Sequence, residues 1–203
     1  MSIHARPSNR PRTSPRRRRR AGGGDDRGSV LVEMTMVAPV LLLLALGALE
    51  MGIAWRDAIS VTHSSRQGAR TGSHLGDELM SDRETLAAVD AVLGGERGNI
   101  TRVVIFDADI AGEMAAGCMT ASQAGRCNHY TGAQVADVAD ASKWGCAPGA
   151  HDRTWCSDTR TNPNAYLGVY VEFDRPWVSG LFGGTGSTLD GTTVMRIEPE
   201  YSA

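Results

Sequence analysis

The amino-acid sequence predicts an α+β protein, in which a long N-terminal transmembrane helix extends into a small extracytoplasmic domain with an antiparallel sheet. Three observations lead to this prediction. The one long apolar run, Val30 to Ala54, is long enough to cross a bilayer. Charge divides the chain into a basic beginning and an acidic remainder. Three later segments have the β-branched composition or the two-residue alternation of strands.

Residues 1–28 form a basic leader. They hold nine arginines and two acidic residues, whereas the chain from Met51 onward has 12 basic and 19 acidic residues. Pro, Ser and Gly interrupt the leader, and it has no apolar periodicity, so it is predicted to be disordered. Such a leader could bind nucleic acid, act as a localisation signal or flank a membrane span. The apolar run that follows favours the last, so no nucleic-acid partner is expected.

The transmembrane helix is assigned to residues 29–54. No charge occurs between Met34 and Leu49. The acidic residues of the run, Glu33 and Glu50, lie near its ends, where a carboxylate can approach the lipid headgroups. A buried helix of a soluble protein is the alternative, but so many consecutive leucines need apolar surroundings on every side. A cleaved secretory signal is disfavoured, because the run is long and no small-residue cleavage site follows it.

The arginines predict the orientation of the span. Nine precede it, and only Arg56, Arg66 and Arg70 lie among the twenty residues after it. The positive-inside bias therefore places the N-terminus in the cytoplasm and residues 55–203 outside. Membrane lipid is the first partner that this topology implies.

Two helices are expected after the span. The first continues from Trp55 to about Thr71, since apolar or small residues recur there with a period close to 3.6. The second begins at Ser81 or Asp82, either of which could be the N-cap, and Glu84 is in the capping-box position relative to Ser81. The pair Gly94-Gly95 ends the second helix.

Three strands and one insert complete the domain. The predicted strands are Ile100 to Phe106, Tyr166 to Phe173 and Thr192 to Ile197. Between the first two lies an insert, residues 112–163, that is poor in large aliphatic side chains and has one expected helix, Gly132 to Ala141. A connection of this length is unusual in a compact domain unless it is cross-linked or functional.

The insert carries all four cysteines, Cys118, Cys127, Cys146 and Cys156. An even number in an oxidising compartment predicts two disulfides with three possible connectivities, of which the local pairs 118–127 and 146–156 are the simplest. A zinc site that includes His129 and His151 is the alternative. It is disfavoured because no C-x-x-C spacing is present.

No catalytic constellation emerges from the sequence. The five histidines are scattered in polar surroundings, and no nucleophile and base occur in a recognisable pattern. The sequence therefore predicts a protein that is not an enzyme and has no cofactor, no metal and no catalytic residues. An exported enzyme with a composite site is an alternative that motifs alone leave open.

The entry to the membrane carries the most informative motif. From Arg27 the chain reads Arg-Gly-Ser-Val-Leu-Val-Glu-Met-Thr-Met-Val-Ala-Pro, so that a basic leader ends at Gly28 and Glu33 is the fifth residue after it. This resembles the prepilin-type signal, and the wider pattern resembles the TadE-like family of tight-adherence (Flp-type) pilus proteins. The residues in matching places are Gly28, Val32, Glu33, Pro39, Leu41 to Leu44, Gly47, Glu50 and Gly52.

The close resemblance covers residues 27–72. Within it, Ser65-Arg-Gln-Gly-Ala-Arg70 is similar to the family's A-R-E-G-A-R. Outside it, near the C-terminus, Val194–Pro199 is similar to the family's C-terminal strand. Met34 stands where the family usually has Phe, and the Cys-bearing insert is not part of the common pattern. Gly47 and Gly52 are expected to let another helix approach closely.

The resemblance implies a minor pilin-like protein, or pseudopilin, of the bacterial cytoplasmic membrane that helps to assemble or anchor Flp-type pili. The implied partners are other pilin-like subunits, the pilus assembly machinery and, if the leader is cleaved, a prepilin peptidase. The implied processing residues are Gly28, Ser29 and Glu33, with Glu33 pairing with the new α-amine of a neighbouring chain. An uncleaved leader, with Glu33 in the headgroups beside Arg27, remains the alternative.

A membrane-tethered binding or sensory domain is the alternative function, with its ligand site in the Cys-bearing insert.

The apolar side chains of the connection from Arg175 to Gly186 have two interpretations. Trp177 and Phe182 are candidates for contacts with a partner protein, and the alternative is that they cover one edge of the sheet.

Overall fold

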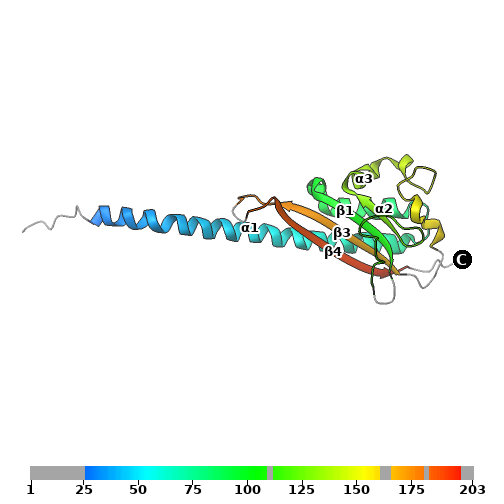
Figure 1. Ribbon diagram of the computed structural model, residues 1–203, viewed down its shortest axis with the longest axis horizontal. Helices are drawn as coiled ribbons and strands as arrows, with labels where there is room; N and C mark the ends of the chain where they lie inside the picture. The colour runs from blue at the N-terminus through cyan, green and yellow to red at the C-terminus, as the bar shows by residue number, and fades with distance from the viewer. Residues whose placement is uncertain (1–25, 109–111, 161–165, 181–182, 198–203) are drawn as a thin grey trace, which may run out of the picture. The chain divides into compact units, whose positions relative to one another are not determined.

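The computed structural model describes residues 26–108, 112–160, 166–180 and 183–197 of the 203-residue chain (Figure 1). The chain divides into two compact units with a boundary between Leu44 and Ala45, and one long helix contributes to both. The longer elements, in chain order, are α1 (Asp26–Leu75), α2 (Ser81–Leu93), β1 (Ile100–Ala108), β2 (Cys127–Thr131), α3 (Gly132–Ala136), β3 (Tyr166–Pro176) and β4 (Gly186–Arg196). Short 3-10 turns are η1 (Gly94–Asn99), η2 (Asp137–Ala139), η3 (Ala141–Lys143), η4 (Arg153–Trp155) and η5 (Ser157–Thr159).

The four strands form one antiparallel sheet in the order β2-β1-β3-β4. Val103 of β1 is opposite Val171 of β3, and Val169 of β3 is opposite Thr193 of β4. This architecture confirms the predicted α+β class with an antiparallel sheet. The sequence prediction contained three of the strands and missed β2, which lies inside the Cys-bearing insert.

One face of the sheet is covered by α2 and by the part of α1 that follows Ala45 (Figure 1). The two-residue alternation of the predicted strand Tyr166 to Phe173 is confirmed in β3. Its four apolar residues on this face are almost fully buried: Leu167, Val169, Val171 and Phe173. They pack with Val61 and Ala69 of α1 and with Leu86 and Val89 of α2. Removing this apolar area from water is the main contribution to the stability of the domain.

The opposite face of the sheet is covered by a smaller cluster. Val104 and Phe106 of β1 pack there with Tyr170 and with the Cys118–Cys127 pair. Gly168 of β3 is opposite Phe106, and a Cβ at Gly168 would lie 2.1 Å from the ring of Phe106. The aromatic ring therefore occupies the space left by the absent side chain.

The ends of the helices correct two predictions. The N-cap of α2 is Met80, with no side-chain hydrogen bond, so the capping box of Ser81 with Glu84 is wrong. Asp82 is instead fully buried and directed toward the insert. The expected helix from Gly132 to Ala141 ends at Ala136, after which the chain continues as 3-10 turns. The end of α2 before Gly94, which has a positive φ, is as predicted.

Two glycines let α1 lie close to the rest of its unit. A Cβ at Gly68 would lie 2.7 Å from Val89, and one at Gly72 would lie 2.4 Å from Leu167 and 2.7 Å from Thr85. These glycines are one helical turn apart and face α2 and β3. Beside them, the hydroxyl groups of Ser65 and Thr193 are 2.9 Å apart. The family-like segment Ser65–Arg70 thus has a packing role within this domain.

We expect Gly72→Ala to lower the free energy of unfolding relative to Gly52→Ala. Both changes add the same methyl group to α1 and gain the same helix propensity, about 1 kcal/mol. Nothing lies within 4 Å of a Cβ at Gly52, whereas Gly72 is enclosed. Overpacking a buried site costs about 1–3 kcal/mol. Urea unfolding of both variants in detergent measures the difference, and equal stabilities would contradict the close packing at Gly72.

Candidate functional site on the N-terminal helix

The predicted processing residues all lie within α1. Gly28, Ser29 and Glu33 are exposed, and the helix begins at Asp26. Residues 26–28, directly before the expected cleavage site, are therefore helical. The Gly28–Ser29 bond falls in the first helical turn, whose N–H groups have no intrahelical acceptors.

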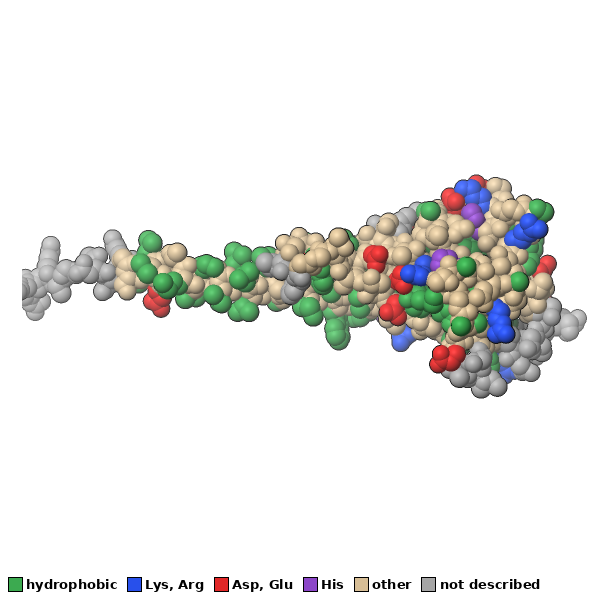
Figure 2. Space-filling view, viewed as in Figure 1, with side chains coloured by type: hydrophobic (Ala, Val, Ile, Leu, Met, Phe, Trp, Pro, Cys, Tyr) green, Lys and Arg blue, Asp and Glu red, His purple; other side chains and the backbone are tan. Residues whose placement is uncertain are grey.

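The first part of α1 exposes apolar side chains all around its circumference. From Val30 to Leu44 its large apolar residues are 43–73% exposed. Figure 2 shows these hydrophobic side chains gathered along the N-terminal part of the helix. The helix is long and apolar enough to cross a membrane, and nothing covers its apolar window within its own unit. A helix that is apolar on every side and uncovered by protein suits a lipid environment.

Glu50 has a buried contact that the sequence did not predict. It was expected near the end of the span, and its side chain is fully buried within the second unit. One carboxylate oxygen accepts a hydrogen bond from the backbone N–H of Ser179, in the connection between β3 and β4. The other lies 3.2 Å from the guanidinium of Arg175. The carboxylate thus holds the β3–β4 connection against α1.

Arg175 completes this contact, which we call the Glu50 clamp: Glu50, Asp57, Arg175 and Ser179. The Nε of Arg175 donates to Asp57 at 2.8 Å, and its guanidinium carbon lies 5.6 Å from the ring centroid of Trp177. A guanidinium can serve two carboxylates because it presents several donors in a fixed plane. The clamp therefore fixes a buried charge through partners that are distant in sequence.

The predicted contact residues Trp177 and Phe182 have different outcomes. Trp177 is half-buried beside Arg175, and Val178 next to it is 69% exposed. Phe182 and Leu181 lie outside the described residues, so the predicted patch stays a prediction there. Among the described residues of this connection, Val178 is the exposed large apolar side chain.

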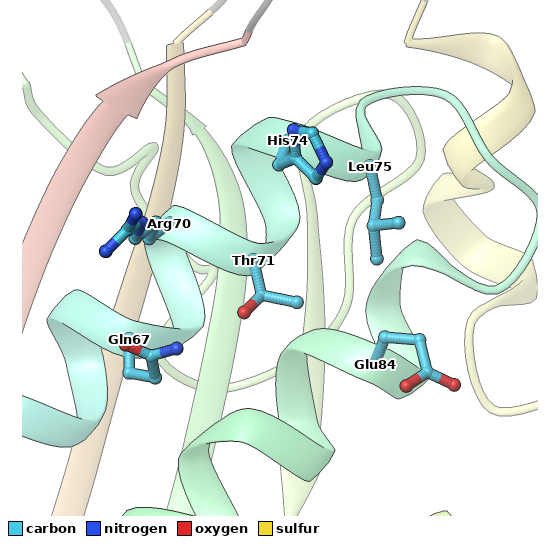
Figure 3. A pocket seen from close by; sticks show the side chains of 6 residues that line it. All are labelled: Gln67, Arg70, Thr71, His74, Leu75 and Glu84. Atoms are coloured by element: carbon cyan, nitrogen blue, oxygen red, sulfur yellow. The ribbon is translucent and has the colours of Figure 1, made fainter.

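Two shallow surfaces lie on α1 in the second unit. One, of about 570 Å³, lies between α1 and α2 and has a mixed polar lining (Figure 3): Gln67, Arg70, Thr71, His74, Leu75 and Glu84. The other, of about 320 Å³, follows one side of α1: Trp55, Ala58, Ile59, Thr62, His63 and Arg66. Trp55 is 74% exposed. Both are open surfaces rather than enclosed cavities.

The four cysteines form two pairs at disulfide distance, Cys118 with Cys127 and Cys146 with Cys156. This is the pairing that the sequence analysis treated as simplest. His129 and His151 consequently have no thiolate partners for the alternative zinc site. The side chain of His151 instead lies 3.2 Å from Gln134 and 3.5 Å from Asp137.

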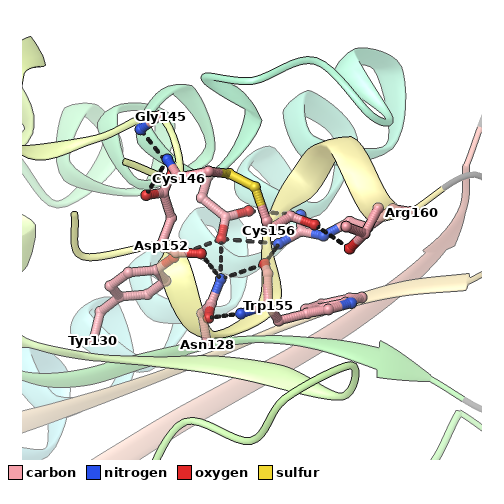
Figure 4. The surroundings of a disulfide bond; sticks show 10 residues. Asn128, Tyr130, Gly145, Cys146, Asp152, Trp155, Cys156 and Arg160 are labelled. Atoms are coloured by element: carbon pink, nitrogen blue, oxygen red, sulfur yellow. Dashed lines mark hydrogen bonds and ion pairs between the residues drawn. A yellow bond between two sulfur atoms is a disulfide. The ribbon is translucent and has the colours of Figure 1, made fainter. Parts of the chain in front are cut away.

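The second disulfide stands beside a buried polar network (Figure 4). Asp82 of α2 accepts two hydrogen bonds from the guanidinium of Arg160, at 2.6 and 2.9 Å. It also accepts from the Tyr130 hydroxyl at 2.5 Å and from the Asn128 side-chain amide at 2.7 Å. Burial, together with the negative charge of Asp82, raises the pKa of Tyr130 well above its ordinary value, so the hydroxyl stays a donor.

Backbone groups of the insert complete this network. Asp152 accepts from the N–H groups of Gly145 and Cys146, and the side-chain oxygen of Asn128 accepts from the N–H of Trp155. Arg160 lies 3.9 Å over the ring of Trp155. The polar side chains thus bind one another and the insert's own backbone, and the arrangement fastens β2 and the later part of the insert to α2.

We expect the unreduced, denatured protein to show no reactive thiol. After reduction, four thiols should react with a maleimide label, and the shift in mass counts them. Removing the 146–156 pair by Cys146→Ser with Cys156→Ser should lower the free energy of unfolding by about 2–4 kcal/mol, because the unfolded chain loses a cross-link. Free thiols in the unreduced protein would contradict the pairing.

Comparison with known proteins supports the resemblance seen in the sequence. Residues 28–70 match the family model described as TadE-like protein. Searches of curated proteins and of solved structures find no match. The matched segment begins at Gly28, includes Glu33 and Glu50, and ends within the part of α1 that packs against α2 and β3.

Proposed function

We propose that this chain, whose residues 28–70 are TadE-like, is a minor pilin-like membrane protein that takes part in assembling or anchoring tight-adherence pili. Its role is association with other proteins, without catalysis. The observation that carries the proposal is that the family match coincides with an uncovered apolar helix. A segment that presents a long apolar surface is suited to a membrane and to packing with other membrane helices.

The topology that goes with this role is a single pass through the cytoplasmic membrane. The arginine-rich leader stays in the cytoplasm, and the sheet domain lies outside, where its disulfides persist. The stretch from Val30 to Leu49, in which Glu33 is the one charged residue, is 20 residues long, about 30 Å as a helix, which is close to the hydrocarbon thickness of a typical bilayer.

Glu33 is the residue we assign to contact between subunits. It is exposed on a helix whose other surface is apolar, and the part of the chain with described side chains gives it no ion pair. An unpaired carboxylate near lipid is unfavourable. Cleavage after Gly28 would give Ser29 an α-amine, a cation at the same level of the membrane. The amine of one subunit and Glu33 of its neighbour could then pair.

Complementation of a deletion strain tests the proposed function. The strain should lose surface pili, and the natural chain should restore them. We expect Glu33→Ala to reach the membrane at the normal level but to fail in restoring pili, whereas Met36→Ala, another exposed position in the same segment, should succeed. Normal piliation of the deletion strain would refute the function, and full rescue by Glu33→Ala would refute the role of Glu33.

A further inference from the structure

We propose that the β3–β4 loop, Trp177 to Gly180 in its described part, rests on the lipid surface at the outer end of the span, held there by the Glu50 clamp. The partner is the headgroup layer of a bilayer, and Val178 is the side chain that enters it. The inference goes beyond the pilus role and requires only that α1 crosses a membrane.

The first argument is the position of Glu50 along the helix. Glu50 directly follows the 20-residue stretch from Val30 to Leu49, in which Glu33 is the one charged residue. Since this stretch matches the hydrocarbon thickness, Glu50 lies where hydrocarbon gives way to headgroups. Its carboxylate accepts the N–H of Ser179 and contacts Arg175. A direct hydrogen bond therefore brings the loop to the level of the membrane boundary.

The second argument is the chemistry of the surface around this contact. Val178, adjacent to the clamped Ser179, is 69% exposed, and Met51, adjacent to Glu50, is 62% exposed. Trp55 lies five residues after Glu50, about 7.5 Å along the helix, and is also exposed. Tryptophan is enriched at the headgroup level, where its ring is amphipathic. The loop and the segment of α1 that directly follows Glu50 thus each carry exposed apolar side chains.

The third argument is that the clamp pairs the Glu50 carboxylate with Arg175 and with the Ser179 N–H. A charge or a free backbone N–H costs free energy beside hydrocarbon. Here the Glu50 carboxylate is buried against Arg175, and the Ser179 N–H donates to it. Arg175 is itself almost fully buried and also contacts Asp57. The Glu50 carboxylate and the Ser179 N–H are consequently paired, and the apolar Val178 is left exposed.

Spin labelling tests this inference in the full chain, reconstituted in phosphatidylcholine–phosphatidylglycerol vesicles. The described cysteines are paired, so a single new cysteine takes the nitroxide. Val178→Cys is compared with Leu43→Cys in the span and with Leu79→Cys, an exposed apolar position in the turn between α1 and α2. Collision with oxygen, which concentrates in lipid, and with a water-soluble nickel chelate reports the depth of each label.

We expect the Leu43 label to be accessible to oxygen and protected from nickel, and the Leu79 label to be accessible to nickel. The Val178 label should be protected from nickel relative to Leu79, at a depth near the headgroups. Adding Glu50→Ala should expose the Val178 label to nickel and leave the Leu43 label unchanged.

A Val178 label as accessible to nickel as Leu79, with Leu43 still in lipid, would overturn the inference and leave the span intact. It would be overturned in favour of a protein partner if Val178 became protected only when other membrane proteins were added. A nickel-accessible Leu43 would refute the span and the inference together. An unchanged Val178 label in Glu50→Ala would contradict the holding role of the clamp.

Discussion

Replacing Asp82 with alanine should lower the free energy of unfolding by about 3–5 kcal/mol, the cost of breaking a buried ion pair by removing one partner. The side chains of Asp82 and Arg160 are 0% and 1% exposed. The change leaves the guanidinium of Arg160 without its carboxylate and takes an acceptor from Tyr130 and Asn128. Since domains are typically stable by about 5–15 kcal/mol, much of the stability would be lost.

Urea unfolding in detergent, followed by tryptophan fluorescence, measures this effect, because Trp155 lies beside Arg160. The matched control is Glu84→Ala on the same helix. Glu84 forms an exposed pair with Arg83, and such pairs contribute about 0–1 kcal/mol. The double variant Asp82→Ala with Arg160→Ala should lose less stability than the sum of the single variants. Equal losses for Asp82→Ala and Glu84→Ala would show that the network adds little.

The second large effect is expected at the membrane entry. If a prepilin peptidase cuts the chain as proposed, the mature protein begins at Ser29 and lacks all nine leader arginines. Gly28→Leu should abolish cleavage, because the bulky side chain occupies the position before the cut bond. The bond lies in the first turn of α1, which is held by few hydrogen bonds, and glycine has poor helix propensity. The peptidase can therefore unwind this turn at small cost.

Co-expression with the cognate peptidase and N-terminal sequencing of the membrane fraction measure this cleavage. Gly52→Leu is the control, since Gly52 is also an exposed glycine of α1 with nothing near its Cβ position. It should be cleaved like the natural chain. If the natural chain still begins at Met1 or Ser2 when the peptidase is active, Ser29 has no α-amine. The proposed partner of Glu33 would then not exist.

The elements that the sequence predicted well are those with strong local patterns. The uninterrupted apolar run gave the helix, β-branched composition gave β1, and alternation from Leu167 to Phe173 gave the buried face of β3. Gly94 gave the end of α2, because few residues adopt its positive φ. Each of these signals depends on neighbours in the chain, so it can be read without knowledge of tertiary contacts.

The features that the sequence did not predict depend on distant partners. Strand β2 is only five residues long and includes Asn128, whose side chain serves the buried network rather than a regular apolar pattern. Asp82 looked like a helix cap because its use by Arg160, 78 residues later, has no local signal. The buried contact of Glu50 was missed for the same reason, since Arg175 lies 125 residues away. The one local signal for this contact was the position of Glu50, an acidic residue directly after an apolar stretch.

The central claim is that α1 crosses the membrane with its N-terminus in the cytoplasm and the sheet domain outside. Fusing two reporters after Ala203, in separate strains, tests it most directly: an alkaline phosphatase that is active only outside the cytoplasm and a β-galactosidase that is active only within it. The account predicts an active phosphatase fusion and a silent galactosidase fusion at equal expression. An active galactosidase fusion with a silent phosphatase fusion would contradict it.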